Sequence, residues 1–529
     1  MKDILLTTIN AKWIHPSLAL RLLKANLGAL EDRCEILEFA LRQPLCEKIQ
    51  PFSAATLLAA RPRILGVSVS IWNHTAVLEL LCELENLWAE QRPVIVLGGP
   101  EVSHLPPEAE IFRYADYIIR GEGEDAFRTL CEEILSDGYE REGTAQQAAA
   151  QQTAAQQTAA QQAAAQQAAA QFINAENVNL CEIKSGYHLY TDEDVTKKLI
   201  YVEASRGCPF NCEFCLSSLQ SGSVKSGSVK DGKTREFPIE PFLSEMDELV
   251  RRGVKTFKFL DRTFNINIKR AREIMEFFLE KIEQKNGKGL VVHFEMVPSL
   301  FPPALRETLS RFPPGSLRLE IGIQTLNPEV AARINRAGYQ NQSDKQDQFN
   351  WQEKELDTIR FLREKTSAII HADLIAGLPG EDLASFGRGF DRLLACLALP
   401  KAQTRCSAAN GKETLTETDN TEIQIGILKL LPGTPISRHN GTLGMCYDSL
   451  PPYEVMETSA ISAADLLRIK NFARFWEIIV NRKLIGFDVN KFSFEKFLAL
   501  SDSLYADFGK NWGIDKNELI KVVNRYYNL

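Results

Sequence analysis

Residues 199–215 read LIYVEASRGCPFNCEFC, a β-type run that leads straight into a loop with three cysteines. Thiolates at Cys208, Cys212 and Cys215 can each bind one iron of a [4Fe-4S] cube, which leaves the fourth iron without a protein ligand. A zinc knot is one alternative, but structural zinc takes four ligands, and no Cys or His lies just after Cys215. An electron-transfer ferredoxin is a second alternative, but its Cys-x2-Cys-x2-Cys spacing differs from the spacing of this loop. The third alternative is that the three cysteines are isolated buried thiols with no joint role. The loop therefore predicts a cluster with one open iron.

Six strand-then-helix units follow one another from residue 199 to about residue 431. We expect strands over residues 199–203, 256–260, 290–296, 317–323, 368–375 and 423–430. The first two helices carry their apolar residues on one face, as helices that cover a parallel sheet do. Six units without an evident seventh and eighth predict a partial (βα)6 barrel of the TIM type, with its site at the C-terminal ends of the strands.

Short β-type runs also alternate with helical patterns over the first 138 residues. We expect strands at 4–6, 34–39, 64–71, 94–97 and 117–119, and helices at 17–30, 75–90 and 124–135. This alternation predicts an α/β fold with a parallel, doubly wound (Rossmann-like) sheet. Such sheets bind ligands beyond the carboxyl ends of their strands.

Between these regions, residues 144–171 repeat Gln-Gln-(Thr/Ala)-Ala-Ala. Five residues advance a helix by about 140°, so the Gln pairs spiral around it and leave no apolar face to pack on a core. The tract is typical of a linker expansion. We therefore divide the chain into a doubly wound domain (1–138), a linker (139–197), a barrel (198–440) and a helical C-terminal domain (441–529). In the last of these, Phe472, Phe475, Trp476 and Ile479 fall on one helix face.

The composition is that of a multidomain globular protein, with 529 residues of which 44% are hydrophobic and 25% charged. No run approaches the roughly 18 apolar residues of a membrane helix, and the N-terminus lacks the apolar core of a signal peptide. We therefore expect a cytoplasmic protein with no membrane partner. A net charge of -8 gives no general reason to expect a nucleic acid partner. Eleven cysteines, thinly spread, fit a reducing compartment.

The cysteine loop resembles the Cys-x3-Cys-x-aromatic-Cys signature of the radical S-adenosylmethionine (SAM) superfamily. In that family the aromatic residue, here Phe214, packs beside the adenine of SAM. The resemblance extends to the ends of three later strands. It implies SAM contacts from Asp261 and Arg262 after the second strand, Glu320 and Gln324 on the fourth, and Ile375 and Gly377 on the fifth. The fifth strand departs from the family's Gly-x-Ile-x-Gly-x-x-Glu pattern in its first Gly, which puts only the adenine contact in doubt.

The resemblance also implies a chemistry. SAM chelates the open iron, and one electron from the reduced cluster cleaves a carbon–sulfur bond to give a 5'-deoxyadenosyl radical. The electron would come from a donor such as a flavodoxin or ferredoxin. Each strand-end residue taken alone could equally be a satisfied turn residue.

Glycine-rich loops follow the later strands of the first domain. Their residues, with two serines on the third strand, resemble the cobalamin (B12)-binding domain that precedes many radical SAM barrels: Ser68, Ser70, Gly98, Gly99, Glu101, Gly121, Glu122 and Gly123. Such loops are often simple turns. No Gly-x-Gly-x-x-Gly follows the first strand, which argues against a dinucleotide. The Asp-x-His-x-x-Gly motif that supplies a histidine to cobalt is absent, and His15, a conceivable substitute, is more often a packing residue.

These patterns lead to one main hypothesis and two alternatives. The main hypothesis is a cobalamin-binding radical SAM enzyme that transfers a methyl group to an unactivated carbon, or performs a related radical reaction, on an unknown small molecule or peptide. A methylthiotransferase would need three further cysteines in the first domain. The candidates there are Cys34, Cys46, Cys82 and Cys131, of which only Cys46 is expected on a loop. The other alternative is a non-catalytic cobalamin or iron–sulfur sensor.

Overall fold

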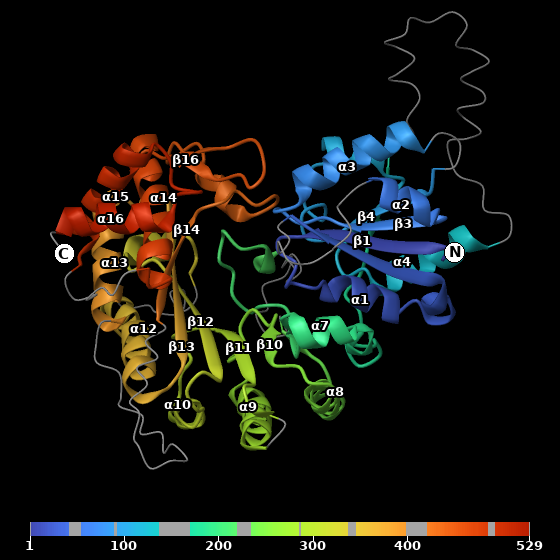
Figure 1. The fold of residues 1–529 in the computed structure, drawn as a ribbon, viewed down its shortest axis with the longest axis horizontal. Helices are drawn as coiled ribbons and strands as arrows, with labels where there is room; N and C mark the ends of the chain where they lie inside the picture. The colour runs from blue at the N-terminus through green and yellow to red at the C-terminus, as the bar shows by residue number, and fades with distance from the viewer. Residues whose placement is uncertain are drawn as a thin grey trace, which may run out of the picture. The chain divides into compact units, whose positions relative to one another are not determined.

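The structure is a computed structural model that describes residues 2–41, 54–88, 92–136, 170–219, 234–284, 287–336, 345–397, 421–484 and 492–527. The chain divides into two compact units, residues 1–201 and 202–529. Each unit is built around a six-stranded sheet (Figure 1). None of the helices in the described ranges is both long and apolar enough to cross a lipid bilayer.

The first unit has a fully parallel sheet, as its alternating pattern predicts. In spatial order its strands are β2 (Cys34–Ala40), β1 (Ile4–Asn10), β3 (Ile64–Ser68), β4 (Val94–Gly98), β5 (Tyr117–Arg120) and β6 (Gln171–Asn174). The strand order reverses between β1 and β3. In doubly wound sheets, ligands bind at the carboxyl ends of the strands beside such a reversal.

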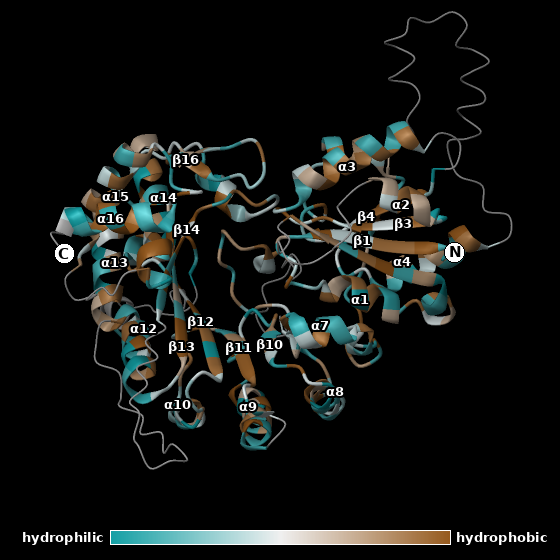
Figure 2. Ribbon diagram, in the orientation of Figure 1, coloured by the Kyte–Doolittle hydropathy of each residue, from teal (hydrophilic) through white to brown (hydrophobic). Residues whose placement is uncertain are grey.

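Helices cover both faces of this sheet (Figure 1). One face packs on α1 (Leu18–Ala25) and α4 (Glu124–Leu135), and the other on α2 (Ala54–Ala60) and α3 (His74–Leu87). Because both faces are buried, the strands are hydrophobic along most of their length, which Figure 2 shows as brown ribbon. The short α2 has no strong signal in the sequence, and we did not predict it.

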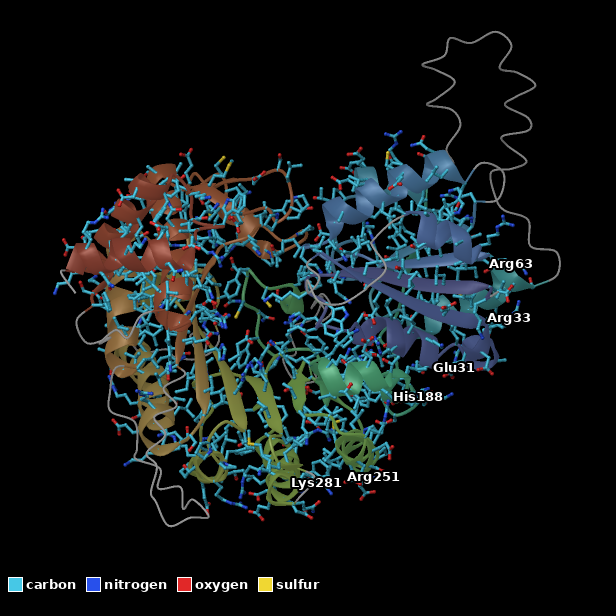
Figure 3. The ribbon with its side chains drawn as sticks, in the orientation of Figure 1. Glu31, Arg33, Arg63, His188, Arg251 and Lys281 are labelled. Atoms are coloured by element: carbon cyan, nitrogen blue, oxygen red, sulfur yellow. The ribbon has the colours of Figure 1, made fainter. Side chains whose placement is uncertain are left out.

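Strand β6 is also absent from our sequence prediction. It directly follows the Ala/Gln tract and pairs with β5. After it, the 3-10 turn Tyr187–Leu189 and α7 (Asp192–Lys197) pack on the first domain. His188 lies 3.0 Å from the carboxylate of Glu31, and both side chains are labelled in Figure 3. The described part of the expected linker therefore lies within the first unit.

The second sheet contains all six strands that the sequence predicts, and its first strand begins just before the boundary of the second unit. In spatial order they are β14 (Glu422–Ile427), β13 (Ile369–Ala376), β12 (Leu317–Gln324), β11 (Val291–Met296), β10 (Thr256–Phe259) and β7 (Ile200–Val202). Neighbouring strands from β10 to β14 pair in parallel, so each strand lies beside its successor, as in a partial barrel.

The helices between these strands are amphipathic and bury their apolar faces. They are α8 (Ile239–Arg251), α9 (Ile268–Glu283), α10 (Pro303–Ser310), α11 (Pro328–Arg333), α12 (Lys345–Lys365) and α13 (Leu383–Leu397). The faces predicted for α8 and α9 are confirmed. On the outer side, Lys281 of α9 lies 2.7 Å from Asp247 of α8, and Arg251 also pairs with Asp247 (Figure 3).

The C-terminal region is mainly helical, as predicted. It contains α14 (Ala463–Trp476), a π-helical turn (Glu477–Asn481), α15 (Phe494–Phe508) and α16 (Lys516–Tyr527). Phe472 and Trp476 are both 1% exposed or less and pack edge-on against Phe390 of α13. An unexpected element is the short antiparallel ribbon of β15 (Cys446–Tyr447) and β16 (Val455–Glu457).

Candidate functional site

The three-cysteine loop begins directly after β8 (Ser205–Arg206) in the second unit. All three thiols are half-buried. The backbone N–H of Cys215 donates to the carbonyl of Cys212 at 3.1 Å, which closes a tight turn at the end of the loop. The Sγ of Cys208 lies 3.5 Å from Oγ1 of Thr263, on the segment that follows β10. The loop therefore follows the first barrel strand, as the sequence predicts.

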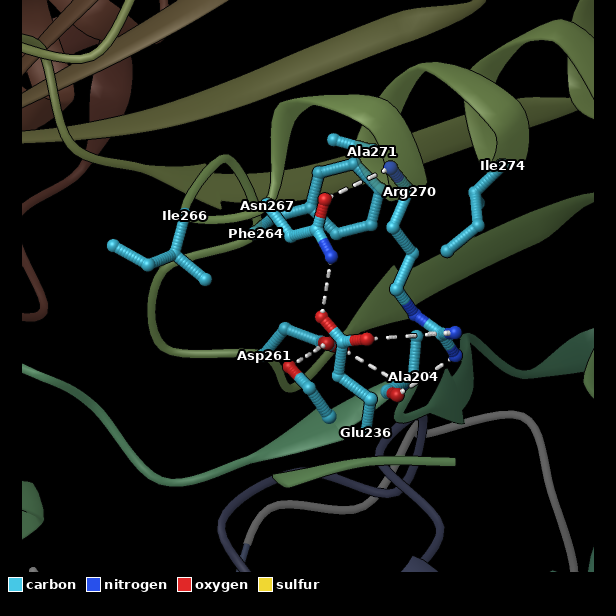
Figure 4. A pocket seen from close by; sticks show the side chains of 10 residues that line it. Ala204, Glu236, Asp261, Phe264, Ile266, Asn267, Arg270, Ala271 and Ile274 are labelled. Carbon is cyan, nitrogen blue, oxygen red and sulfur yellow. Dashed lines mark hydrogen bonds and ion pairs between the residues drawn. The ribbon is translucent and has the colours of Figure 1, made fainter. Parts of the chain in front are cut away.

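Asp261 fixes the base of this loop. Its Oδ2 accepts the backbone N–H of Ala204 at 2.9 Å, and its Oδ1 accepts the hydroxyl of Ser205 at 2.6 Å. The side chain is nearly inaccessible, and burial raises the pKa of Asp261 to about 7. Asp261 lines a small pocket together with Glu236 and Arg270 (Figure 4). Its contact with SAM stays a prediction, because both carboxylate oxygens already hold the loop.

The other end of the loop is held by residues that sequence reasoning missed. Glu213, between the second and third cysteines, accepts hydrogen bonds from Arg438 at 3.0 Å and contacts the ring of His439 at 3.0 Å. Both partners belong to the 3-10 turn Pro435–His439, more than 200 residues later in the chain. No spacing or motif in the sequence links these positions, so nothing there could have revealed the contact.

Glu320 lies in the middle of β12 and is part of an ionic group inside the barrel. Its Oε2 accepts from Nζ of Lys258 at 3.2 Å and lies 3.4 Å from Nε2 of His293. Burial raises the pKa of Glu320, but His293 and Lys258 outweigh burial and bring it to about 2. Asp373 of β13 also faces this group, and burial together with the charges of Glu320 and Glu295 raises its pKa well above the usual value.

The remaining predicted SAM contacts are spread over the strand ends. Gln324 ends β12 with a φ of +68°, where the register with β13 shifts. A non-glycine residue in this region stores strain, which is common at functional sites. Arg262 is exposed and lies 3.8 Å from Glu295, whereas Phe214 and Ile375 are half-buried. Their roles toward SAM stay predictions.

The donor set of the loop fits the predicted cluster. Within the described ranges, no three His, Cys, Asp or Glu side chains are gathered closely enough to hold a single metal ion. A [4Fe-4S] cube spreads its thiolate ligands over different irons, whereas tetrahedral zinc draws four ligands around one ion. Three half-buried thiols on one loop, with no fourth ligand beside them among the residues that the structure describes, therefore match the cube better than the zinc knot.

In the first unit, the predicted cobalamin loops come together at the carboxyl edge of the sheet. Ser68 ends β3 and is in register with Gly98, which ends β4. Gly121, Glu122 and Gly123 follow β5 and lead into α4. Parallel pairing thus brings these residues to the edge where doubly wound sheets bind ligands. Their contacts with cobalamin stay predictions.

These loops are also tied to one another. The backbone N–H of Ser70 donates to Asn73 at 2.7 Å, and the buried Glu101 lies 3.0 Å from the ring of His74. Glu122 accepts the backbone N–H of Val178 at 2.9 Å. The ring of His15 lies 2.9 Å from the hydroxyl of Tyr201, which fits a packing role.

Gly99 has a structural reason to be glycine. Its φ is +104°, and a Cβ there would lie 2.5 Å from the carbonyl oxygen of Val69. Two loops of the protein therefore approach too closely at this point for any side chain. Packing of the protein against itself is therefore a sufficient reason for glycine at position 99.

Two family models match the chain. The B12 binding domain matches residues 4–131, and the Radical SAM superfamily matches residues 202–392. Among curated proteins, an uncharacterized methyltransferase of Pyrococcus horikoshii is 31% identical over 184 residues, which are 34% of this chain and 36% of the relative. The ribosomal protein methylthiotransferase RimO of a Synechococcus species is 24% identical over 192 residues, 35% of this chain and 37% of the relative. The chain thus spans little more than a third of the length of these curated relatives.

Two solved structures share the fold over most of the chain. One is the radical SAM methyltransferase TsrM of Kitasatospora setae with cobalamin and a [4Fe-4S] cluster bound. It has a TM-score of 0.53 at 16% identity, over 85% of this chain and 78% of that one. The other is the cobalamin-dependent SAM radical enzyme OxsB, with a TM-score of 0.58 at 15% identity over 100% and 75% of the two chains.

The fold, the cysteine loop and the two family matches define a class of protein in which a B12-binding domain precedes a radical SAM barrel. This chain contains one domain of each of these two families. Its cofactors are therefore a [4Fe-4S] cluster, SAM and cobalamin.

Proposed function

We propose that this enzyme transfers a methyl group to an unactivated carbon of a small-molecule or peptide substrate. One observation carries the proposal. The B12-binding domain and a three-cysteine radical SAM barrel, which leaves one iron open, occur in the same chain. An enzyme of this composition has both a source of carbon radicals and a carrier for a methyl group. An electron donor such as a flavodoxin or ferredoxin would reduce the cluster.

Each cofactor has a set of residues that would hold it. Cys208, Cys212 and Cys215 would bind the cluster, and the loops after β3, β4 and β5 would bind cobalamin. When bound, the cluster and SAM supply one-electron cleavage of a carbon–sulfur bond, and cobalamin supplies the methyl group. The chain's own residues then act by positioning. Asp261 holds the base of the cysteine loop through Ala204 and Ser205, and Thr263 lies against Cys208.

The C-terminal region covers the end of β13. The backbone N–H of Leu428 donates to Ala376 at 2.9 Å, and that of Val455 on β16 donates to Leu428 at 2.8 Å. Val455 lies over Gly377, the residue that follows β13. We infer that this ribbon forms one wall of the substrate site and keeps water from the reacting carbon.

The methylthiotransferase alternative has less support. The relative RimO carries that name, but this activity would need three more cysteines able to act as thiolate ligands in the first domain, residues 1–138. Burial raises the pKa of Cys34 to about 12, and burial also raises the pKa of Cys131, so both thiols resist ionisation. Cys82 is exposed on α3, and Cys46 lies outside the described residues.

SAM with a deuterated methyl group tests the proposal. The protein is reconstituted anaerobically with iron, sulfide and cobalamin, reduced, and incubated with metabolite and peptide fractions. We expect a product that carries the label on carbon. Cys212→Ala should abolish labelling, whereas Cys181→Ala, which alters an exposed cysteine outside the loop, should leave it intact. Labelled methylthio groups would instead support the methylthiotransferase, and label-free turnover would contradict methyl transfer.

Cobalamin retention is a second measurement. The full chain, refolded or purified with hydroxocobalamin, should keep about one cobalamin per chain after gel filtration. A chain that keeps none while still binding its cluster would rule out methyl transfer through cobalamin. It would leave the radical SAM chemistry standing.

A further inference from the structure

A buried carboxylate lies inside the cysteine loop. Glu213 separates Cys212 from Phe214 and is only 6% exposed. The guanidinium of Arg438 grips it at both oxygens, with Nε 3.0 Å from Oε2 and a terminal nitrogen 2.6 Å from Oε1. The ring of His439, also buried, lies 3.0 Å from Oε2. Two-point pairing of this kind is among the strongest and most directional contacts in proteins.

Backbone hydrogen bonds reinforce the same junction. The N–H of Glu213 donates to the carbonyl of Ile334 at 3.0 Å, and its own carbonyl accepts the N–H of Ile436 at 3.1 Å. The amide of Asn335 donates to the carbonyl of Asn211 at 3.1 Å. The loop is thus held between the chain that follows α11 and the turn that begins at Pro435.

These contacts have two physical consequences. A loop without regular secondary structure is kept in one conformation, because releasing it would leave a buried carboxylate without partners. The contacts also place a negative and a positive charge next to a predicted cluster ligand. Charges close to an iron–sulfur cluster help to set its reduction potential.

We propose that Glu213, Arg438 and His439 form a clamp that positions the cysteine loop for cluster binding and balances the charge beside the cluster. These are positioning residues, since none of them is expected to touch SAM or the substrate. The inference rests on the proposed function in one respect only, namely that the loop binds a [4Fe-4S] cluster.

Iron retention tests the positioning role. The full-length protein and its variants are reconstituted anaerobically, and the loss of the cluster's visible absorbance to an iron chelator is followed. Removing an outer partner of a metal site commonly weakens binding by about 10–100-fold. We therefore expect Glu213→Ala to lose its iron at least about tenfold faster than the wild type. The matched control is Arg306→Gln, which breaks an ion pair with Asp357. This pair is in the same unit as the cysteine loop but distant from it in the sequence. The control should lose its iron at the wild-type rate.

The reduction potential tests the charge balance, because two variants that break the same pair should act in opposite directions. Glu213→Gln removes the negative charge and leaves Arg438 uncompensated, which favours the reduced cluster and raises the midpoint potential. Arg438→Gln leaves the buried carboxylate uncompensated and lowers it. The first shift should be larger, because Glu213 is buried whereas Arg438 is 60% exposed and screened by water. Mere loosening of the loop would move both potentials the same way.

The outcomes separate the two proposals. A wild-type protein that takes up no cluster contradicts the proposed function itself. A wild-type protein that takes up a cluster, with variants that retain iron equally well or shift the potential in one common direction, contradicts the clamp alone. If Glu213→Ala does not fold, as judged by circular dichroism, the surface variant Arg438→Gln still decides the question.

Discussion

At the scale of single residues, the properties of the candidate site come mostly from burial. Asp261 follows a strand in the sequence like many turn aspartates, yet in the structure it is 2% exposed and its pKa lies near 7 because of burial. The family resemblance implied only a SAM contact for Asp261 after the second barrel strand. The burial of Asp261, and with it the raised pKa, depends on how closely β10 and the base of the cysteine loop pack around the side chain.

This burial predicts a pH dependence of stability. Asp261 holds a proton in the folded protein up to about pH 7 but loses it near pH 4 when unfolded. The folded state therefore binds more protons between these values, and the free energy of unfolding falls as pH rises through this range, by up to about 4 kcal/mol. Asp261→Asn stays neutral and should lose this part of the decline. The measurement is urea unfolding of the cluster-free protein at several pH values between 4.5 and 7.5.

The control is the exposed Asp357→Asn, which should keep the wild-type pH dependence. The stability of Asp261→Asn could instead fall with rising pH as steeply as that of the wild type. That result would show that other buried acids, such as Glu355, cause most of the pH dependence.

At the scale of elements, the six barrel strands were all predicted, because their apolar runs and the helices between them have clear periods. Several short elements were missed, among them β6, α2 and the ribbon of β15 and β16. Strand β6 has four residues next to a low-complexity tract, and α2 has only seven residues, too few to show a clear helical period. The ribbon of β15 and β16 is too short to show alternation. Each of these is stabilised by its tertiary neighbours rather than by its own sequence.

The ribbon leads to a prediction about Gly377. Its φ is +81°, and a Cβ would lie 2.4 Å from Val455 Cγ1. Gly377→Ala should therefore cost the backbone strain of about 1–3 kcal/mol and, in addition, about 1–3 kcal/mol of overpacking against the ribbon. Gly253→Ala is the matched control, because its φ is +102° but nothing lies within 4 Å of the added Cβ. The two variants are compared by thermal unfolding.

The difference between the two midpoints isolates the contact with the ribbon. Equal losses of stability in the two variants would mean that Val455 moves aside and that β16 does not pack firmly over the end of β13.

At the scale of the whole molecule, the segment after the Ala/Gln tract belongs with the first unit. The main contact is a buried ionic group. Arg21 of α1 lies 2.9 Å from Glu38 of β2 and 2.7 Å from Asp194 of α7, with all three side chains at least 88% buried. Residues that are more than 170 positions apart are thus joined inside one unit.

Breaking this group should release the segment. Arg21→Ala leaves the buried carboxylate of Glu38 without its cation and leaves Asp194 with Lys198 alone, so it should destabilise the first unit by about 3–5 kcal/mol. Arg33→Ala, which breaks the exposed pair with Asp3 (Figure 3), should have no measurable effect. Urea unfolding measures the loss, and limited proteolysis should cut within residues 170–201 only in the Arg21 variant. Equal resistance to protease in both variants would contradict the role assigned to Arg21.

The sequence alone determined the two sheets, the order of their elements and the three-cysteine loop, because hydrophobic periods and cysteine spacing are local patterns that a linear chain displays. It also predicted which strand ends carry polar residues. Only the tertiary structure decided what surrounds them: Asp261 bound to the loop base, Glu213 clamped by Arg438 and His439, and β6 added to the first sheet. Those features depend on contacts between segments that are far apart in the sequence. Such contacts are stabilised by burial and complementary charge, and they produce no periodic pattern along the chain that sequence analysis could detect.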